Sequence, residues 1–216
     1  MSAGERSQPA GQTCTSLRRR LLSSHVPARG FTLVELIAVV TIIGVLATIA
    51  VYSVRKYIQH AKAAEAAEIV GAIKAGQEAY YDETFQYLVV TPGNSPNKFY
   101  PDSPSAASGK IKIQWGADDG SDCSGCGAKF KVLGVMPSAP VLFRYSCYVG
   151  AATDNPGNGV ADKVKDNANP FAGVTQAGQA FYVVNAVSDL DGDGGKMSGV
   201  VGSNLMGDLF SSNIGQ

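Results

Sequence analysis

Three aspartates near the carboxyl end of the chain have the spacing of metal ligands. Asp189, Asp191 and Asp193 stand at alternate positions, and Gly194 follows at the sixth position of the segment. This order resembles the start of a calcium-binding loop, because Ca²⁺ takes about six to eight oxygen ligands. Val200 stands where an EF-hand would place its bidentate glutamate, so another ligand would have to come from elsewhere in the chain. The segment therefore predicts either a calcium site, with calcium as the one candidate cofactor, or an Asp/Gly turn.

Cysteine chemistry is the second possibility. Cys123 and Cys126 have the spacing of a redox or zinc motif, but the chain has no second pair of this kind and no histidine nearby. With Cys147 they permit one disulfide and one leftover thiol in an oxidising compartment. We expect Cys147 to bond with either Cys123 or Cys126, which would connect their loop to a later strand.

A single carboxylate interrupts the longest apolar run of the chain. Residues 31–54, FTLVELIAVVTIIGVLATIAVYSV, form a stretch of 24 residues in which Glu35 is the only charge. At a rise of about 1.5 Å per residue the run would span the hydrocarbon core of a membrane, roughly 30 Å. A charge near the bilayer centre costs about 2.5 to 3.5 kcal/mol, and less near a helix end. The run therefore predicts a transmembrane helix in which Glu35 needs a partner.

The remaining composition gives no sign of an enzyme. The chain has 216 residues, of which 45% are hydrophobic and 17% charged, which suits one globular domain with a membrane segment. The chain has two histidines, His25 and His60, and its sequence contains no nucleophile, phosphate-loop or dinucleotide-binding motif. Beyond residue 30 the chain has 13 basic and 17 acidic residues, so attraction to nucleic acid is not indicated.

The pattern beyond residue 54 predicts the elements that would position these residues. Apolar residues recur at steps of three and four up to Thr84, which extends the helix to about 80 Å. Gly71 and Gly76 each cost this helix about 1 kcal/mol relative to alanine, so either marks close packing or a bend. Short β-branched and aromatic runs follow a proline-rich loop. They predict strands at residues 110–115, 128–135, 141–149, 180–187 and 197–201.

The segment from Arg29 to Leu36, RGFTLVEL, closely resembles the cleavage and methylation signature of type IV pilins and type II secretion pseudopilins. The resemblance implies that prepilin peptidase cuts after Gly30 and methylates the new amine of Phe31. It also implies that the helix enters a filament core, where Glu35 would pair with the Phe31 amine of a neighbouring subunit. Many pilins carry a proline at the place of Tyr52, and this sequence does not.

These observations predict an α+β, pilin-like fold with a long N-terminal helix packed against a C-terminal antiparallel sheet. The expected parts are a leader at 1–30, a transmembrane and filament-core helix at 31–54, its amphipathic continuation at 55–90 and a sheet domain at 91–216. We expect a non-enzymatic structural subunit of a type IV pilus. It would be an inner-membrane precursor first and part of an extracellular filament afterwards. Its partners would be copies of itself, prepilin peptidase and the assembly platform.

Two other functions fit the same anchor. One is a type II secretion pseudopilin in a periplasmic pseudopilus, with the corresponding secretion platform as its partner. The other is a minor pilin that acts as an adhesin or as a receptor for DNA uptake. Lys129 and Lys131 would share one face of a predicted strand and form a basic patch with Arg144, although acidic neighbours weaken a DNA-binding role.

Overall fold

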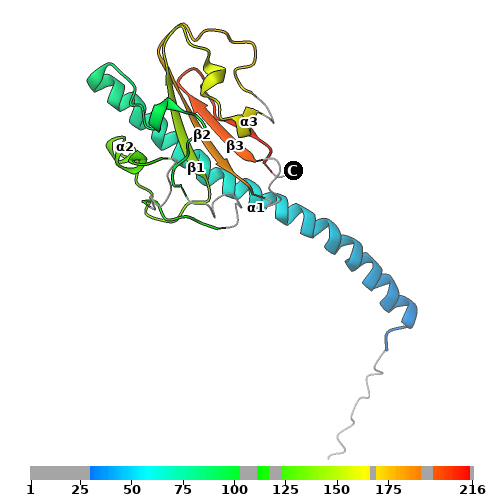
Figure 1. Ribbon diagram of the computed structural model, residues 1–216. Coiled ribbons are helices and arrows are strands. Elements are labelled where there is room, and N and C mark those ends of the chain that lie inside the picture. Colours follow the sequence, from blue (N-terminus) through cyan, green and yellow to red (C-terminus); the bar gives the residue numbers. More distant parts are fainter. Residues whose placement is uncertain (1–29, 103–110, 117–122, 166–168, 191–196, 215–216) are drawn as a thin grey trace, which may run out of the picture. The chain divides into compact units, whose positions relative to one another are not determined.

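The computed structural model describes residues 30–102, 111–116, 123–165, 169–190 and 197–214 (Figure 1). The chain divides into two compact units, Met1–Val45 and Leu46–Gln216, which are treated separately. Asp191 and Asp193 of the predicted calcium loop lie outside the described residues.

Helix α1 comprises Leu33–Thr84, 52 residues in all, and confirms the predicted long helix. The helix continues through Tyr52 without a break, consistent with the absence of a proline there. Within the second unit its buried residues follow the steps of three and four that the sequence indicated. They are Ala63, Ala66, Ile69, Val70, Ile73 and Gln77.

A four-stranded antiparallel sheet in the order β1-β2-β3-β4 follows, which confirms the α+β, pilin-like class. The strands are β1 (Arg144–Gly150), β2 (Phe181–Ser188), β3 (Ser198–Ser203) and β4 (Phe210–Ser212). The register pairs Cys147 with Val184 and Val184 with Gly202.

Both faces of the sheet are covered. Figure 1 shows β1, β2 and β3 lying across the second half of α1, and Tyr182, Val184 and Ala186 of β2 share a core with that helix. The alternate residues of β2 pack in a second core beneath the 3₁₀ helix η3 (Pro156–Gly159) and α3 (Asp162–Lys165). Every residue of β2 is therefore buried, which explains its nearly continuous apolar sequence.

The outer edge of β1 is covered by a segment that we call the strap, residues 91–100, which includes the 3₁₀ helix η1 (Pro92–Asn94). Tyr100 and Tyr145 exchange two backbone hydrogen bonds of 2.8 and 2.7 Å. The side-chain amide of Asn94 accepts from the nitrogen of Val149 at 2.8 Å and donates to its oxygen at 2.6 Å. The strap thus occupies edge groups that a further strand would need.

Two of the predicted strands are wrong. Residues 128–135 fall mostly in helix α2 (Cys126–Val132), where Cys126, Phe130 and Leu133 are buried at a helical spacing of four and three. The described part of residues 110–115 contributes only an isolated bridge between Ile113 and Val141. The other three predicted strands correspond to β1, β2 and β3, and the short β4 was not predicted.

Gly76 marks close packing, one of the two roles expected for the glycines of α1. A Cβ built at Gly76 would lie 2.3 Å from the carbonyl oxygen of Leu133, just after α2, whereas one at Gly71 would meet nothing within 4 Å. The backbone that follows α2 can therefore approach α1 only because residue 76 has no side chain.

Candidate functional site

The segment that resembles a processing signal lies at the start of α1. Gly30 and Phe31 precede the helix, and Phe31 is 78% exposed. Thr32 caps the helix, because its Oγ1 accepts a hydrogen bond of 3.2 Å from the backbone nitrogen of Glu35. The first backbone bond follows from Leu36 to the oxygen of Thr32, at 3.1 Å. A peptide bond between Gly30 and Phe31 is thus exposed immediately before an ordered helix.

Thr32 is a residue that the sequence analysis missed. Thr-x-x-Glu before an apolar run is the pattern of a capping box, and Thr32 and Glu35 have this spacing. Glu35 stands in the first turn of α1, where the positive end of the helix dipole favours a carboxylate. The side chain of Glu35 is exposed, so it is accessible to a partner outside the chain.

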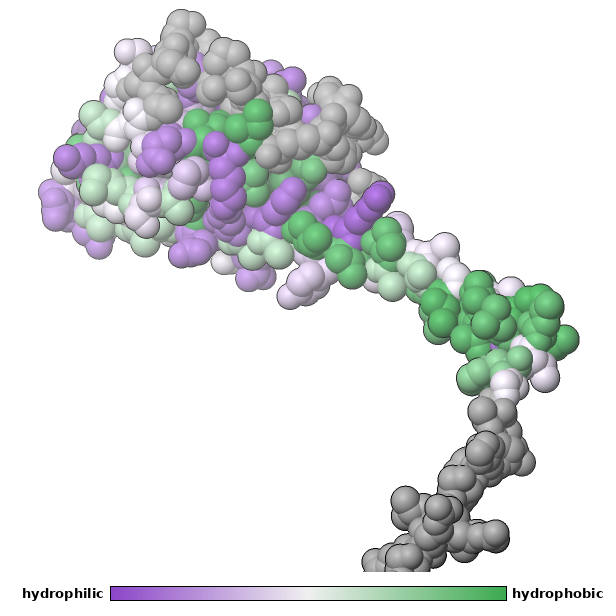
Figure 2. Space-filling view, turned by 90° about the horizontal axis from the view of Figure 1, so that it is seen from below, coloured by the Kyte–Doolittle hydropathy of each residue, from purple (hydrophilic) through white to green (hydrophobic). Residues whose placement is uncertain are grey.

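The surface of α1 after this cap is mainly apolar as far as Val54. All residues from 31 to 58 are exposed, and Figure 2 shows their hydrophobic side chains gathered along the helix. By length and composition α1 is able to cross a membrane, and none of its most apolar stretch is buried within the described chain. Exposure of such a large apolar surface to water is unfavourable, so this part of α1 requires lipid or other protein around it.

The cysteines correct our predicted pairing. Cys123 bonds Cys126, and Cys147 is a buried free thiol. The turn before α2 returns the chain on itself, with a hydrogen bond of 3.1 Å from the Cys126 nitrogen to the Cys123 oxygen and a Cα separation of 5.5 Å. Cys147 lies inside β1 and receives a hydrogen bond of 3.2 Å from Nε2 of Gln77. A disulfide that closes so short a loop removes little entropy from the unfolded chain, and it therefore stabilises the fold by only about 2 kcal/mol.

The predicted basic patch is wrong as well. Lys129 and Lys131 lie on helix α2, where residues two apart point to different sides. The guanidinium of Arg144 stacks over the ring of Phe99, 5.4 Å from its centre. These three cations therefore do not form the shared strand face that the sequence indicated.

Only one of the predicted calcium ligands is described. Asp189 directly follows β2 and is almost fully buried, at 2% exposure. Asp191 and Asp193 are among the residues left undescribed. Calcium binding by this loop stays a prediction.

A further acidic residue, Glu65, ties α1 to the sheet domain. Its Oε1 accepts from the backbone nitrogen of Leu142 at 2.9 Å, and its Oε2 pairs with Lys112 at 3.2 Å. The sequence analysis did not single out Glu65. A carboxylate one turn before a buried apolar residue gives no signal of such a contact in the sequence alone.

Comparison with known proteins identifies the class. Residues 27–51 match the family model described as the prokaryotic N-terminal methylation motif, the signature of type IV pilins and pseudopilins. The chain therefore carries a type IV pilin or pseudopilin N-terminus, which implies processing by prepilin peptidase and polymerisation into a filament. This class is structural rather than enzymatic, and the apolar helix fits a membrane-anchored precursor. No curated protein and no solved structure matches the chain.

Proposed function

We propose that this protein is a structural subunit of a type IV pilus. Prepilin peptidase cuts after Gly30 and methylates Phe31, and the mature chain then polymerises through the first half of α1. The observation that carries the proposal is the methylation motif placed directly on an exposed apolar helix. The motif supplies the processing signal, and the helix supplies a surface that only lipid or neighbouring subunits would cover.

Glu35 has the central role in assembly in this proposal. Its carboxylate pairs with the Phe31 ammonium of a neighbouring subunit, so that both charges are neutralised in a core shielded from water. The exposed position of both residues at the helix start supports this pairing.

The disulfide-bonded turn before α2 fits an exported domain in a pilus and in a periplasmic pseudopilus alike, because disulfides form both in the periplasm and outside the cell. A pseudopilin would carry the same N-terminal motif, so the location of the filament distinguishes the two. A receptor for DNA uptake is less favoured, because Lys129, Lys131 and Arg144 do not share a face.

The test is mass spectrometry of filaments sheared from the surface of the source cells. We expect an abundant chain that begins at Phe31 with one added methyl group. A Gly30→Leu variant serves as the control, and its uncut precursor should stay in the membrane fraction. A methylated chain that is found only in the periplasm and membrane would identify a pseudopilin instead.

A further inference from the structure

The charges of α1 are segregated along its length. Arg55 and Lys56 open the polar part of the helix, and acidic residues dominate from Glu65 onward, ending with Asp82 and Glu83 in a last turn that has no basic residue. This order opposes the helix dipole, which favours acids at the start and bases at the end. Electrostatics within the helix therefore do not explain it.

The side chains of Arg55, Lys56 and Glu68 make no hydrogen bond or ion pair with other described residues. Arg55 and Lys56 also have no acidic residue three or four positions away on the helix. The charged neighbour of Glu68 at this spacing is Glu65, which repels it.

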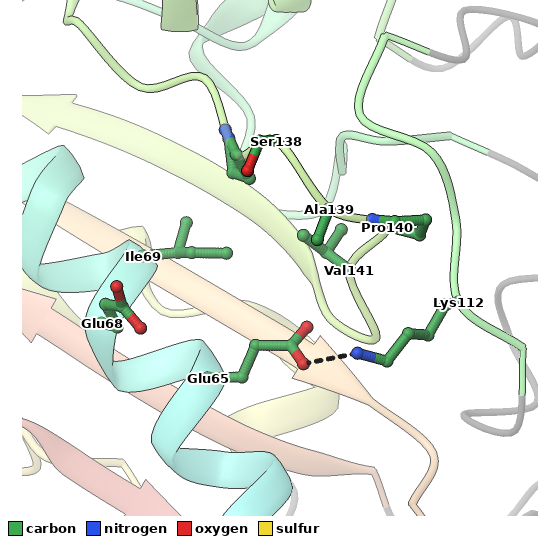
Figure 3. Close-up of a pocket in the computed structure, with 9 residues that line it drawn as sticks. Glu65, Glu68, Ile69, Lys112, Ser138, Ala139, Pro140 and Val141 are labelled. Carbon is green, nitrogen blue, oxygen red and sulfur yellow. Dashed lines mark hydrogen bonds and ion pairs between the residues drawn. The ribbon is translucent and has the colours of Figure 1, made fainter.

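Glu68 borders a hollow of about 250 Å³ on the surface of the second unit. Figure 3 shows Glu65 extending from α1 toward Lys112, which approaches from the opposite side, and Glu68 beside Glu65 on the same helix. Ile69 adds an apolar side chain to the wall formed by α1, and the other wall is formed by residues 137–141, which are apolar except for Ser138. Such walls reduce solvent screening of a charge that enters the hollow.

The hollow lacks one positive charge. It has two carboxylates and one ammonium, and Glu65 already engages Lys112 and the Leu142 nitrogen. Glu68 is exposed and adds a carboxylate without a counterion among the described residues. One lysine or arginine side chain would neutralise the site.

We propose that the hollow at Glu68 receives the side chain of Arg55 or Lys56 of a second copy of this chain. The inference rests on the proposed filament and defines a contact between its subunits, separate from the pairing of Glu35 with Phe31. The same copy cannot supply the cation, because Lys56 lies 12 residues before Glu68 on one helix, about 18 Å along its axis.

The contact defines a stagger. Two parallel α1 helices must be displaced along their axes by about 18 to 20 Å to bring Arg55 or Lys56 of one copy level with Glu68 of the other. In-register packing would instead place cations beside cations and acids beside acids, which is unfavourable. The charge order of α1 therefore favours staggered neighbours over neighbours in register.

Charge reversal with rescue tests this contact in cells that assemble filaments from the full chain. We expect Glu68→Lys to lower the yield of sheared filaments about tenfold. A loss of about 1.4 kcal/mol of association free energy per contact corresponds to that factor in an association constant. Arg55→Glu with Lys56→Glu should have a similar effect. The three changes combined should restore assembly, because the opposite charges then face each other again.

Asp82→Lys is the matched control, because it makes the same charge change on α1 outside the hollow and should leave the yield unchanged. Membrane levels of each precursor show that the variants insert and remain stable. Loss of filaments with Asp82→Lys as well, or no restoration in the combined variant, would overturn the contact.

A crosslink gives an independent readout. In filaments of the paired variant Lys56→Cys with Glu68→Cys, or Arg55→Cys with Glu68→Cys, mild oxidation should produce dimers on a non-reducing gel. Lys56→Cys with Asp82→Cys should not. Wild-type filaments together with no crosslink in either pair would contradict the contact and leave the proposed function standing, whereas absence of wild-type filaments would contradict the proposed function itself.

Discussion

At the scale of single residues, the start of α1 separates two roles that Glu35 could have. The hydrogen bond to Thr32 Oγ1 comes from the backbone nitrogen of residue 35, so it does not depend on the side chain. The carboxylate itself is exposed and interacts favourably with the helix dipole. Substitution of the side chain therefore tests the carboxylate while the cap is kept.

We expect Glu35→Ala to insert into the membrane as well as the wild type and to fail in assembly. Removing a charge from the apolar helix favours insertion. In the filament the neighbour's Phe31 ammonium would lose its partner, and an unpaired buried charge typically costs about 3 to 5 kcal/mol. The measurement compares the amounts of protein in the membrane and sheared fractions.

Glu35→Gln is the control for shape, because it keeps the size of the side chain and removes its charge. It should assemble as poorly as Glu35→Ala. Normal filaments from either variant would show that the carboxylate is not the assembly contact.

Cys147 provides a second prediction for a single residue. Burial raises the pKa of its thiol from 9.0 to about 12, although the hydrogen bond from Gln77 opposes this shift. The folded protein therefore keeps the thiol neutral where an unfolded chain would ionise it. Its contribution to stability is complete below pH 9 and is lost as the pH rises towards 12.

We expect the melting temperature of the detergent-solubilised chain to fall between pH 9 and 11, and to fall less steeply in Cys147→Ala. One titrating group changes the free energy of unfolding by up to about 1.4 kcal/mol per pH unit in this range. A thiol reagent at pH 8 should not label Cys147 until denaturant is added. Rapid labelling of Cys147 in the folded protein would contradict its burial.

At the scale of elements, Gly76 and Gly71 form a matched pair on one helix. Alanine at position 76 would place a Cβ against the backbone oxygen of Leu133, and a collision with backbone cannot be relieved by a change of rotamer. Alanine at position 71 meets nothing within 4 Å and gains helix propensity of about 1 kcal/mol. The same substitution should thus have opposite signs at the two positions.

We expect Gly76→Ala to lower the free energy of unfolding by about 1 to 3 kcal/mol, and Gly71→Ala to raise it slightly. Thermal melting of both full-length variants in one detergent measures the difference. Equal or reversed effects would show that α1 and the segment after α2 do not pack as described.

Residues 189–194 carry the calcium prediction. Calcium should raise the melting temperature of the chain, because a ligand that binds only the folded state stabilises it. Asp191→Ala should remove the effect. Identical melting curves in calcium and in chelator would assign the aspartates to an ordinary turn.

The sequence predicted elements well where a long pattern recurred. The period of α1 extends over its second half and cannot be mistaken for a strand, and β2 combines β-branched residues with turn signals on both sides. Residues 126–132 are too few to distinguish the helical period from the strand period. Their apolar residues fit one turn of a helix and also a strand in which apolar residues alternate with lysines. The α2 assignment therefore depended on tertiary packing, such as that of Phe130 against Tyr100 and Trp115, which the sequence does not show.

The processing segment of the candidate site could be predicted from the sequence, whereas the contacts around it in the folded domain could not. Gly30, Phe31 and Glu35 stand in one continuous string of residues that identifies the processing segment. The contact of Glu65 with Lys112 joins residues through tertiary structure, and spacing along the chain does not encode it. The Cys123–Cys126 disulfide is local, and the sequence analysis considered that spacing only as a redox or zinc motif. The prediction that Cys147 forms a disulfide failed because the turn before α2 brings the other two cysteines, which are closer in sequence, within bonding distance of each other.

At the scale of the whole molecule, the two ways in which a protein can polymerise make different demands on its surface. Growth through α1 needs an exposed apolar helix, and this chain has one. Growth through strand addition needs a free sheet edge, because unpaired edge groups act as a template for another chain.

The strap along β1 bears on the second of these routes. With Tyr100 and Asn94 bonded to the edge groups of Tyr145 and Val149, an approaching strand would first have to displace the strap. At the opposite edge β4 has only three residues, too few to guide a long pairing. In the proposed filament, where domains would be crowded at high local concentration, these two edges would protect the sheet from amyloid-like strand addition.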